Sequence, residues 1–193
     1  MIETIWLPSL VLAIYQNRDA PRSRFIQMAT VRGDGRPANR TVVFRGFLNR
    51  GPRLTFVTDA RSEKITELEH AAWSQLCWYF PVTHEQFRIS GPVTLVRHDT
   101  DQPALHDARR DAWRSLAESV RMSFTWPTPG EPRDGSVPFP SAHPDPETPP
   151  SHFCLLVLDP HEVDLLEING SPQNRWIYRL NEAGRWQGAE VNP

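Results

Sequence analysis

The sequence predicts a mainly antiparallel β protein, a barrel with a few helices added to it. Three observations support this fold class. Short segments rich in β-branched and aromatic residues recur along the chain, for example at residues 41–44. Turn residues such as those at 33–37 and 51–52 separate these segments. Helical patterns are few, and a chain of 193 residues suits one domain with a sizeable core.

The expected elements follow from this pattern in chain order. Helices are expected at residues 8–17, where Pro21 stops the helix, at 62–70, with Asp59 or Ser62 as the N-cap, and at 103–120. Strands are expected at residues 24–32, 40–47, 53–57, 72–80, 85–98, 153–158, 162–168, 175–180 and 186–191.

The expected helix at 103–120 is amphipathic. One face carries Leu105, Ala108, Ala112, Leu116 and Val120, and the residues off this face are Arg109, Arg110, Arg114 and Glu118. A proline-rich loop follows at residues 127–150. It is too long for a simple connector, so we interpret it as a lid, a partner-binding arm or a partly disordered segment.

Composition excludes several classes of partner. A net charge of -2 and an isoelectric point near 6.4 argue against general binding to nucleic acid or to an anionic membrane. No stretch reaches the roughly 20 apolar residues that cross a bilayer, and no signal peptide is expected. Cys77 and Cys154 both have apolar neighbours. We therefore expect free thiols and a cytoplasmic protein.

Standard catalytic motifs are absent from the sequence. It has no Walker loop, GxGxxG, HExxH, nucleophile elbow or CxxC, and the seven histidines lack metal-ligand spacing. We assign no catalytic residue and expect no metal. What remains is a set of basic and amide residues, which are either a ligand site or ordinary surface charges.

The most informative of these residues lie around the second and third expected strands. Ser62 and Lys64 stand where a helix begins, next to Arg61, and this arrangement favours a phosphate group. Arg40 and Arg45 share one expected strand, but their odd spacing would send them to opposite faces. A bulge near Gly46 would re-aim one of them.

The order of these segments resembles that of the pyridoxamine 5'-phosphate oxidase family, from about residue 25 to residue 193. The resemblance rests on RTVVFR at 40–45, FVTDARSEK at 56–64, Trp78, QFRISG at 86–91, NRWIYR at 174–179 and GRW at 184–186. It implies a split antiparallel β-barrel over residues 1–193 that binds FMN. It also implies a homodimer with FMN at its interface.

The resemblance also implies which residues contact FMN. These are Arg40, Thr41, Val42, Val43, Arg45, Val57, Thr58, Arg61, Ser62, Lys64, Gln86, Ser123 and Arg175. Gln86 is expected to reach the flavin of the neighbouring subunit. The family commonly has Arg where this chain has Glu63, and we expect Arg61 to supply that charge. Trp126 is interpreted either as a stacking partner of the flavin or as a core aromatic residue.

The implied function is FMN-dependent oxidoreduction of a small molecule. Pyridoxal phosphate-forming relatives carry Arg-x-His shortly before the late flavin Arg, whereas this chain has Ser171, Pro172 and Gln173 there. We therefore expect pyridoxamine 5'-phosphate to be a poor substrate. The alternatives are a non-catalytic flavin-binding or haem-binding protein or sensor, and an oligonucleotide-binding barrel, against which the net acidity counts.

Overall fold

The fold is built on one curled antiparallel sheet. A computed structural model describes residues 4–136 and 138–193. Its strands are β1 (Phe25–Val31), β2 (Pro37–Val43), β3 (Gly46–Phe47), β4 (Leu54–Asp59), β5 (Trp73–Phe80), β6 (Glu85–Val96), β7 (Phe153–Leu158), β8 (Glu162–Glu167), β9 (Asn174–Leu180) and β10 (Trp186–Val191). Its helices are α1 (Leu7–Gln16), η1 (Leu48–Arg50), α2 (Glu63–His70), α3 (Pro103–Arg114), α4 (Glu118–Met122) and η2 (Ser123–Thr125).

The long strand β6 joins the two halves of the sheet. Its first part pairs with β8 and its last part with β7, so the sheet runs β10-β9-β8-β6-β5-β1-β2 on one side and continues through β7, β4 and β3 on the other. Gly91 lies at the crossing. A Cβ atom there would stand 1.8 Å from the Asp159 carbonyl oxygen, so only glycine fits. This curled half-barrel confirms the predicted fold class.

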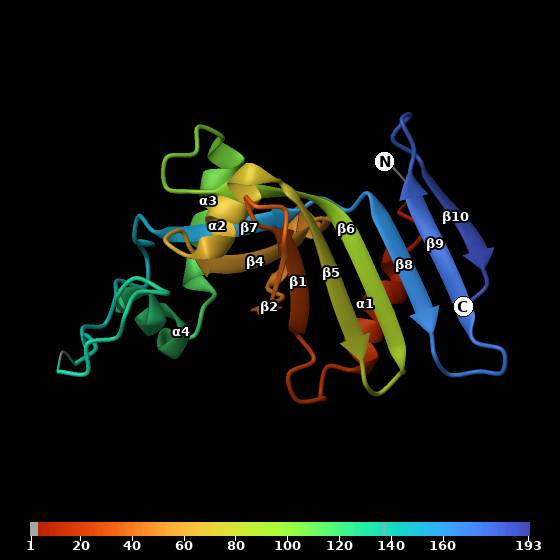
Figure 1. The fold of residues 1–193 in the computed structure, drawn as a ribbon, viewed down its shortest axis with the longest axis horizontal. Coiled ribbons are helices and arrows are strands. Elements are labelled where there is room, and N and C mark those ends of the chain that lie inside the picture. The colour runs from red at the N-terminus through yellow and green to blue at the C-terminus, as the bar shows by residue number, and fades with distance from the viewer. Residues whose placement is uncertain (1–3, 137) are drawn as a thin grey trace.

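The core lies on one face of the sheet. Alternating residues such as Met28, Trp78 and Phe87 are fully buried there, as the period of two predicts. Helix α1 packs against the same cluster through Leu10 and Ala13, and Figure 1 shows this helix behind β5 and β6. The residues between the core positions therefore face outward from the sheet.

One expected helix is divided in two. The segment predicted as a single helix at 103–120 forms α3 and α4, with a break at residues 115–117. The Ser115 hydroxyl donates to the Ala112 carbonyl oxygen at 2.7 Å, a bond that competes with helix continuation. Arg109, which we expected off the apolar face, is only 3% exposed, and Trp113 is fully buried. The placement of Arg109 was predicted wrongly.

The proline-rich loop leaves the barrel after η2 and returns at β7. Figure 1 shows it extending away from the sheet beside α4. Its returning end is anchored by α3. Arg109 donates to the carbonyl oxygens of Phe153, at 2.9 Å, and Pro150, at 2.6 Å, and the Trp113 indole donates to that of Asp145 at 2.9 Å. In the part of the chain that is described, no helix is long and apolar enough to cross a membrane.

Candidate functional site

The chain changes strand partners between Phe44 and Arg45. The Phe44 amide donates to Arg24 of the β1 side, whereas the Arg45 amide donates to Thr55 on β4, both at 2.9 Å. Gly46 follows with a φ of 137°, a conformation that favours glycine. The odd spacing of Arg40 and Arg45 is thus resolved by a change of strand rather than by a bulge within one strand.

A cluster of cations and hydroxyl groups surrounds the start of α2. The Lys64 ammonium donates to the hydroxyl oxygens of Thr58, at 3.0 Å, and Ser62, at 2.9 Å. Burial lowers the pKa of Lys64, and the positive charge of nearby Arg40 lowers it further. Ser62 occupies the predicted N-cap position, but its hydroxyl donates to the Asp59 carbonyl oxygen and does not cap the helix. An incoming anion would relieve the repulsion between the two cations.

Arg40 is held in this cluster by a buried carboxylate. Its Nη2 lies 2.5 Å from Oε2 of Glu67, which also accepts a bond of 2.6 Å from the Thr30 hydroxyl. Burial alone would raise the pKa of Glu67, but the hydrogen bonds from Thr30 and Arg40 outweigh it, so that its pKa lies below the usual range. Glu67 is therefore the counter-ion that fixes Arg40. Sequence reasoning missed it, because its carboxylate lies in a helix where solvent exposure is the default.

A cavity of about 330 Å³ opens next to this cluster. It is lined by Arg45, Val57, Thr58, Asp59, Val120, Ser123, Phe124 and Pro129. The Nε of Arg45 is buried and finds no hydrogen-bond partner among the described residues. Burial lowers the pKa of Arg45, and neighbouring Arg24 lowers it further. A buried guanidinium nitrogen without an acceptor is costly, so an anionic or carbonyl-bearing ligand fits this cavity.

The edge strand β2 supplies backbone groups beside the cavity. Val42 points into the core, and Thr41 and Val43 alternate with it on the outward face. The bond from Phe44 to Arg24 fixes the alternation of the ladder, so the N–H and C=O groups of Thr41 and Val43 point away from β1. These groups face the free edge of the sheet and are available to a ligand.

Arg61 pairs with residues outside the cluster of Lys64, Thr58 and Ser62. Its guanidinium pairs with Asp59 at 2.6 Å and donates to the Trp126 carbonyl oxygen at 3.1 Å. It therefore ties the end of β4 to the start of the proline-rich loop. Trp126 itself is 44% exposed, so the interpretation of this residue as a core aromatic is wrong.

A second polar cluster lies on the outward face of the sheet. Gln86 and Arg88 project from β6, and Arg175 projects from β9. Between the two arginines lies Asp164 of β8, which pairs with Nη2 of Arg88 and, at 2.9 Å, with Nη2 of Arg175. Burial alone would raise the pKa of Asp164, but these hydrogen bonds outweigh it and hold the pKa below its usual range. Asp164 is in register with Arg88 across β8 and β6, a pairing that the sequence alone did not predict.

The two clusters are not brought together within one chain. Strands β1 and β5 stand between β2 and β6, and three strand spacings amount to about 14 Å. Lys64, Arg40 and Arg45 thus form one group, and Gln86 and Arg175 form another. Within the described residues, no group of acidic, histidine or cysteine side chains could hold a metal ion.

Comparison with known proteins places the chain in a family. Residues 3–97 match the sequence model of the family described as pyridoxamine 5'-phosphate oxidase, FMN-binding domain. The curated Arabidopsis thaliana protein named pyridoxine/pyridoxamine 5'-phosphate oxidase 2 is 36% identical over 191 residues, which cover 97% of this chain and 96% of the relative.

Solved structures agree with this assignment. A pyridoxamine 5'-phosphate oxidase-related, FMN binding protein from Nostoc punctiforme is 44% identical with a TM-score of 0.94, over 99% of this chain and 98% of that one. PhzG from Burkholderia lata shares the fold, with a TM-score of 0.76 at 21% identity over 100% of this chain and 94% of that one. The fold and the comparisons together define a split-barrel protein of the FMN-binding type. The chain belongs to the pyridoxamine 5'-phosphate oxidase family, whose cofactor is FMN.

Proposed function

We propose that this chain is an FMN-dependent oxidoreductase of a small molecule, with FMN held between two copies of the chain. The observation that carries the proposal is the buried Nε of Arg45, which has no hydrogen-bond partner among the described residues and lies beside the cluster of Lys64, Thr58 and Ser62. One terminal phosphate suits this cluster, and no dinucleotide fingerprint is present in the sequence. FMN therefore fits better than FAD.

In this proposal, Lys64, Arg40, Thr58 and Ser62 hold the phosphate. Arg45, Val57 and Ser123 line the cavity beside it, and the free backbone groups of β2 contact the remainder of the cofactor. The Ser123 hydroxyl donates to the Val120 carbonyl oxygen at 2.7 Å, so its oxygen still offers lone pairs to the cavity.

The second copy completes the site. Gln86 and Arg175 are too far from Lys64 within one chain, so in the assembled protein they would come from the other subunit. Bound FMN supplies the hydride acceptor, and the residues of the chain position it and tune its electronics. This division of labour agrees with the lack of an acid–base pair in the sequence. Free thiols at Cys77 and Cys154 support a cytoplasmic location.

The visible spectrum of the purified protein tests the cofactor. Flavin absorbance, with FMN released on heating and identified by chromatography, is the expected result. Haem absorbance would support the haem-binding alternative. Recovery of FAD, or no binding after incubation with excess FMN, would contradict the proposal.

The substrate is proposed to differ from pyridoxamine 5'-phosphate. Ser171, Pro172 and Gln173 provide no cation before Arg175, and Pro172 has no backbone N–H to donate. Losing a positioned charge contact costs a few kcal/mol, or roughly 100-fold in rate or affinity. We expect slow turnover when peroxide and pyridoxal phosphate are followed with oxygen as acceptor. Rapid turnover at micromolar substrate would refute this expectation.

A further inference from the structure

The start of the proline-rich loop is tied to the turn between β4 and α2. The Arg61 guanidinium donates through Nη2 to the Trp126 carbonyl oxygen at 3.1 Å. The His152 ring donates through Nε2 to the Phe124 carbonyl oxygen at 2.6 Å, and the His152 carbonyl oxygen accepts from the Ala60 amide at 2.7 Å. Arg61 and His152 therefore hold the chain at η2 and just after it.

Asp59 fixes the Arg61 side chain. Nε and Nη2 of Arg61 lie 3.0 and 2.6 Å from the two carboxylate oxygens of Asp59, and the Arg61 amide donates to the same carboxylate at 2.8 Å. Burial alone would raise the pKa of Asp59, but the hydrogen bonds from Arg61 outweigh it, so that its pKa lies below the usual range. Among the described residues, only Nη1 of the Arg61 side-chain nitrogens has no hydrogen-bond partner. A bidentate contact with a phosphate would therefore require Arg61 to release Asp59 or the loop.

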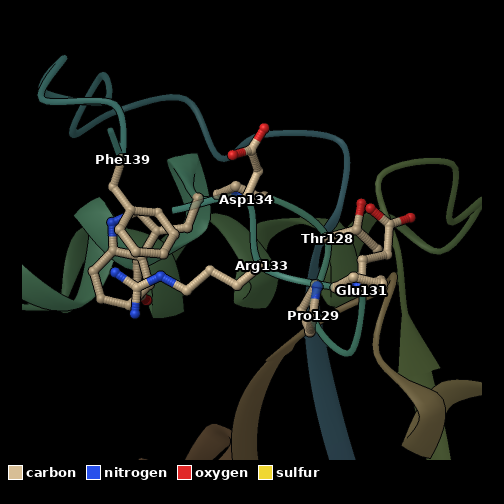
Figure 2. Close-up of a pocket in the computed structure, with 10 residues that line it drawn as sticks. Thr128, Pro129, Glu131, Arg133, Asp134 and Phe139 are labelled. Atoms are coloured by element: carbon tan, nitrogen blue, oxygen red, sulfur yellow. The ribbon is translucent and has the colours of Figure 1, made fainter. Parts of the chain in front are cut away.

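The segment that Arg61 holds forms a wall shared by two cavities. Ser123 and Pro129 line the cavity that contains Arg45, and both also line a cavity of about 410 Å³ inside the loop. Figure 2 shows this loop cavity with Pro129 and Glu131 on the side opposite Phe139. Glu131 also interacts electrostatically with Arg61. The position of Arg61 therefore helps to set the position of this wall.

We propose that Arg61 is a positioning residue that holds residues 126–131 of the loop as a wall of the flavin site, and that it does not bind the FMN phosphate. This role differs from the sequence expectation, in which Arg61 supplies a cation to the phosphate. The effect on flavin binding rests on the proposed function, whereas the tie to the loop does not. Loss of the tie weakens every flavin that uses this wall, whether or not it carries a phosphate.

A comparison of FMN with riboflavin, which lacks the phosphate, tests the role in binding. The double variant Asp59→Asn/Arg61→Gln removes the pair without leaving the charge of Asp59 uncompensated near Lys64. It should weaken FMN and riboflavin by the same factor, about 10-fold, in fluorescence titrations. Lys64→Ala should instead lower the ratio of FMN affinity to riboflavin affinity. A larger loss for FMN than for riboflavin in the double variant, or no loss for either, would overturn the proposal.

Trypsin digestion without flavin tests the tie itself. Arg133 is an exposed cleavage site in the loop, and Arg185 is an exposed site in the turn between β9 and β10. In the Asp59→Asn/Arg61→Gln variant, cleavage after Arg133 should become about 10-fold faster relative to cleavage after Arg185, because the loop opens locally. Mass spectrometry identifies the two cuts. An unchanged ratio of the two rates would overturn the proposal.

The turn between β1 and β2 offers a matched control. The Arg36 amide donates to Asp34 at 3.0 Å and the two side chains pair at 3.6 Å, with the same sequence spacing as Asp59 and Arg61. Neither Asp34 nor Arg36 lines the two cavities. Asp34→Asn/Arg36→Gln should therefore change neither the flavin affinities nor the relative cleavage after Arg133.

The two measurements separate this proposal from the proposed function. Failure of the original chain to bind either flavin would contradict the flavin function, and the digestion would still decide whether Arg61 holds the loop. Binding of FMN by the original chain, with unchanged cleavage in the Asp59→Asn/Arg61→Gln variant, would contradict the role of Arg61 alone.

Discussion

At the scale of single residues, the candidate site depends on interactions between side chains that lie far apart in the sequence. Arg40 and Lys64 lie on different elements, yet the charge of Arg40 lowers the pKa of Lys64. Basic residues at 40, 45 and 64 could be predicted from the sequence as anion ligands. Their partners Glu67 and Asp164 could not be chosen in advance, because a carboxylate becomes a counter-ion only when the fold buries it beside a cation.

Removal of Lys64 tests the phosphate site. Lys64→Ala should weaken FMN binding by about 1–3 kcal/mol, the usual contribution of a charge-assisted hydrogen bond. Arg40→Ala should weaken FMN binding by a similar amount and also destabilise the fold, because it leaves the buried Glu67 with only the more distant Arg32, at 3.8 Å, as a cation partner. Flavin fluorescence titration and urea unfolding measure the two effects.

A double variant separates ligand binding from stability. Arg40→Ala combined with Glu67→Gln removes the uncompensated charge, so stability should recover while FMN affinity stays low. Recovery of FMN affinity as well would show that Arg40 acts only through the fold. Unchanged FMN affinity in both the Lys64 and the Arg40 variants would show that other residues form the phosphate site.

Acid should destabilise the protein through its paired carboxylates. The pKa values of Glu67 and Asp164 are lowered in the folded state. A carboxylate of this kind adds stability that is fully present above its unfolded pKa, about 4, and is lost as the pH falls through the folded pKa. The free energy of unfolding should therefore fall as the pH is lowered from 5 toward 2.

Urea unfolding at a series of pH values measures this dependence. Glu67→Gln should show a shallower decrease, because the residue can no longer take up a proton. A variant that follows the same curve as the original chain would show that Glu67 does not contribute to acid unfolding.

At the scale of elements, strands were predicted better than the helix after them. Alternating burial on β1 and β5 matches the expected period, and the turn residues marked the strand ends. The prediction of one continuous helix at 103–120 was wrong at residues 115–117. Arg121 donates to the Leu116 carbonyl oxygen at 2.5 Å and so satisfies a group that a continuous helix would satisfy itself. This contact joins α4 to the break that precedes it and leaves no pattern within a single helical period.

Arg109 should be the residue that fastens α3 to the end of the proline-rich loop. Arg109→Ala leaves the Pro150 and Phe153 carbonyl oxygens without their donor, so the free energy of unfolding should fall by about 2–4 kcal/mol. Cleavage by protease within residues 126–150 should become faster. Arg110→Ala, at a partly exposed residue paired with Asp107, is the matched control and should cost about 0.5 kcal/mol or less. Equal effects of the two substitutions would show that Arg109 does not anchor the proline-rich loop.

At the scale of the whole molecule, the outward face of the sheet has the features of an interface for a second copy of the chain. Tyr79 is 43% exposed and stands in register with Gln86, on the same face of the sheet as the pair of Arg175 and Asp164. Exposed aromatic side chains such as this one are enriched at protein interfaces. The sequence resemblance predicted a homodimer. One chain contains both groups of site residues but does not bring them together, so the homodimer remains a prediction.

Light scattering should give a mass of twice the 22.1 kDa of one chain. Tyr79→Glu should shift the mass toward one chain and weaken FMN binding, because a buried charge would enter the interface from each copy. Leu12→Glu changes an apolar residue on α1 that is somewhat more exposed, at 54%, and should leave the mass unchanged. A monomer that binds FMN with full protection from solvent would refute the shared site.

The separation of the two polar clusters within one chain, which lie on strands at least about 14 Å apart, has a genetic consequence. If every site combines Lys64 of one copy with Arg175 of the other, a Lys64 variant and an Arg175 variant damage opposite halves of it. Coexpression of the two inactive forms would then yield mixed pairs in which one site is doubly damaged and the other is intact. Random pairing would restore about a quarter of all sites. Two defective alleles of this gene would thus complement each other.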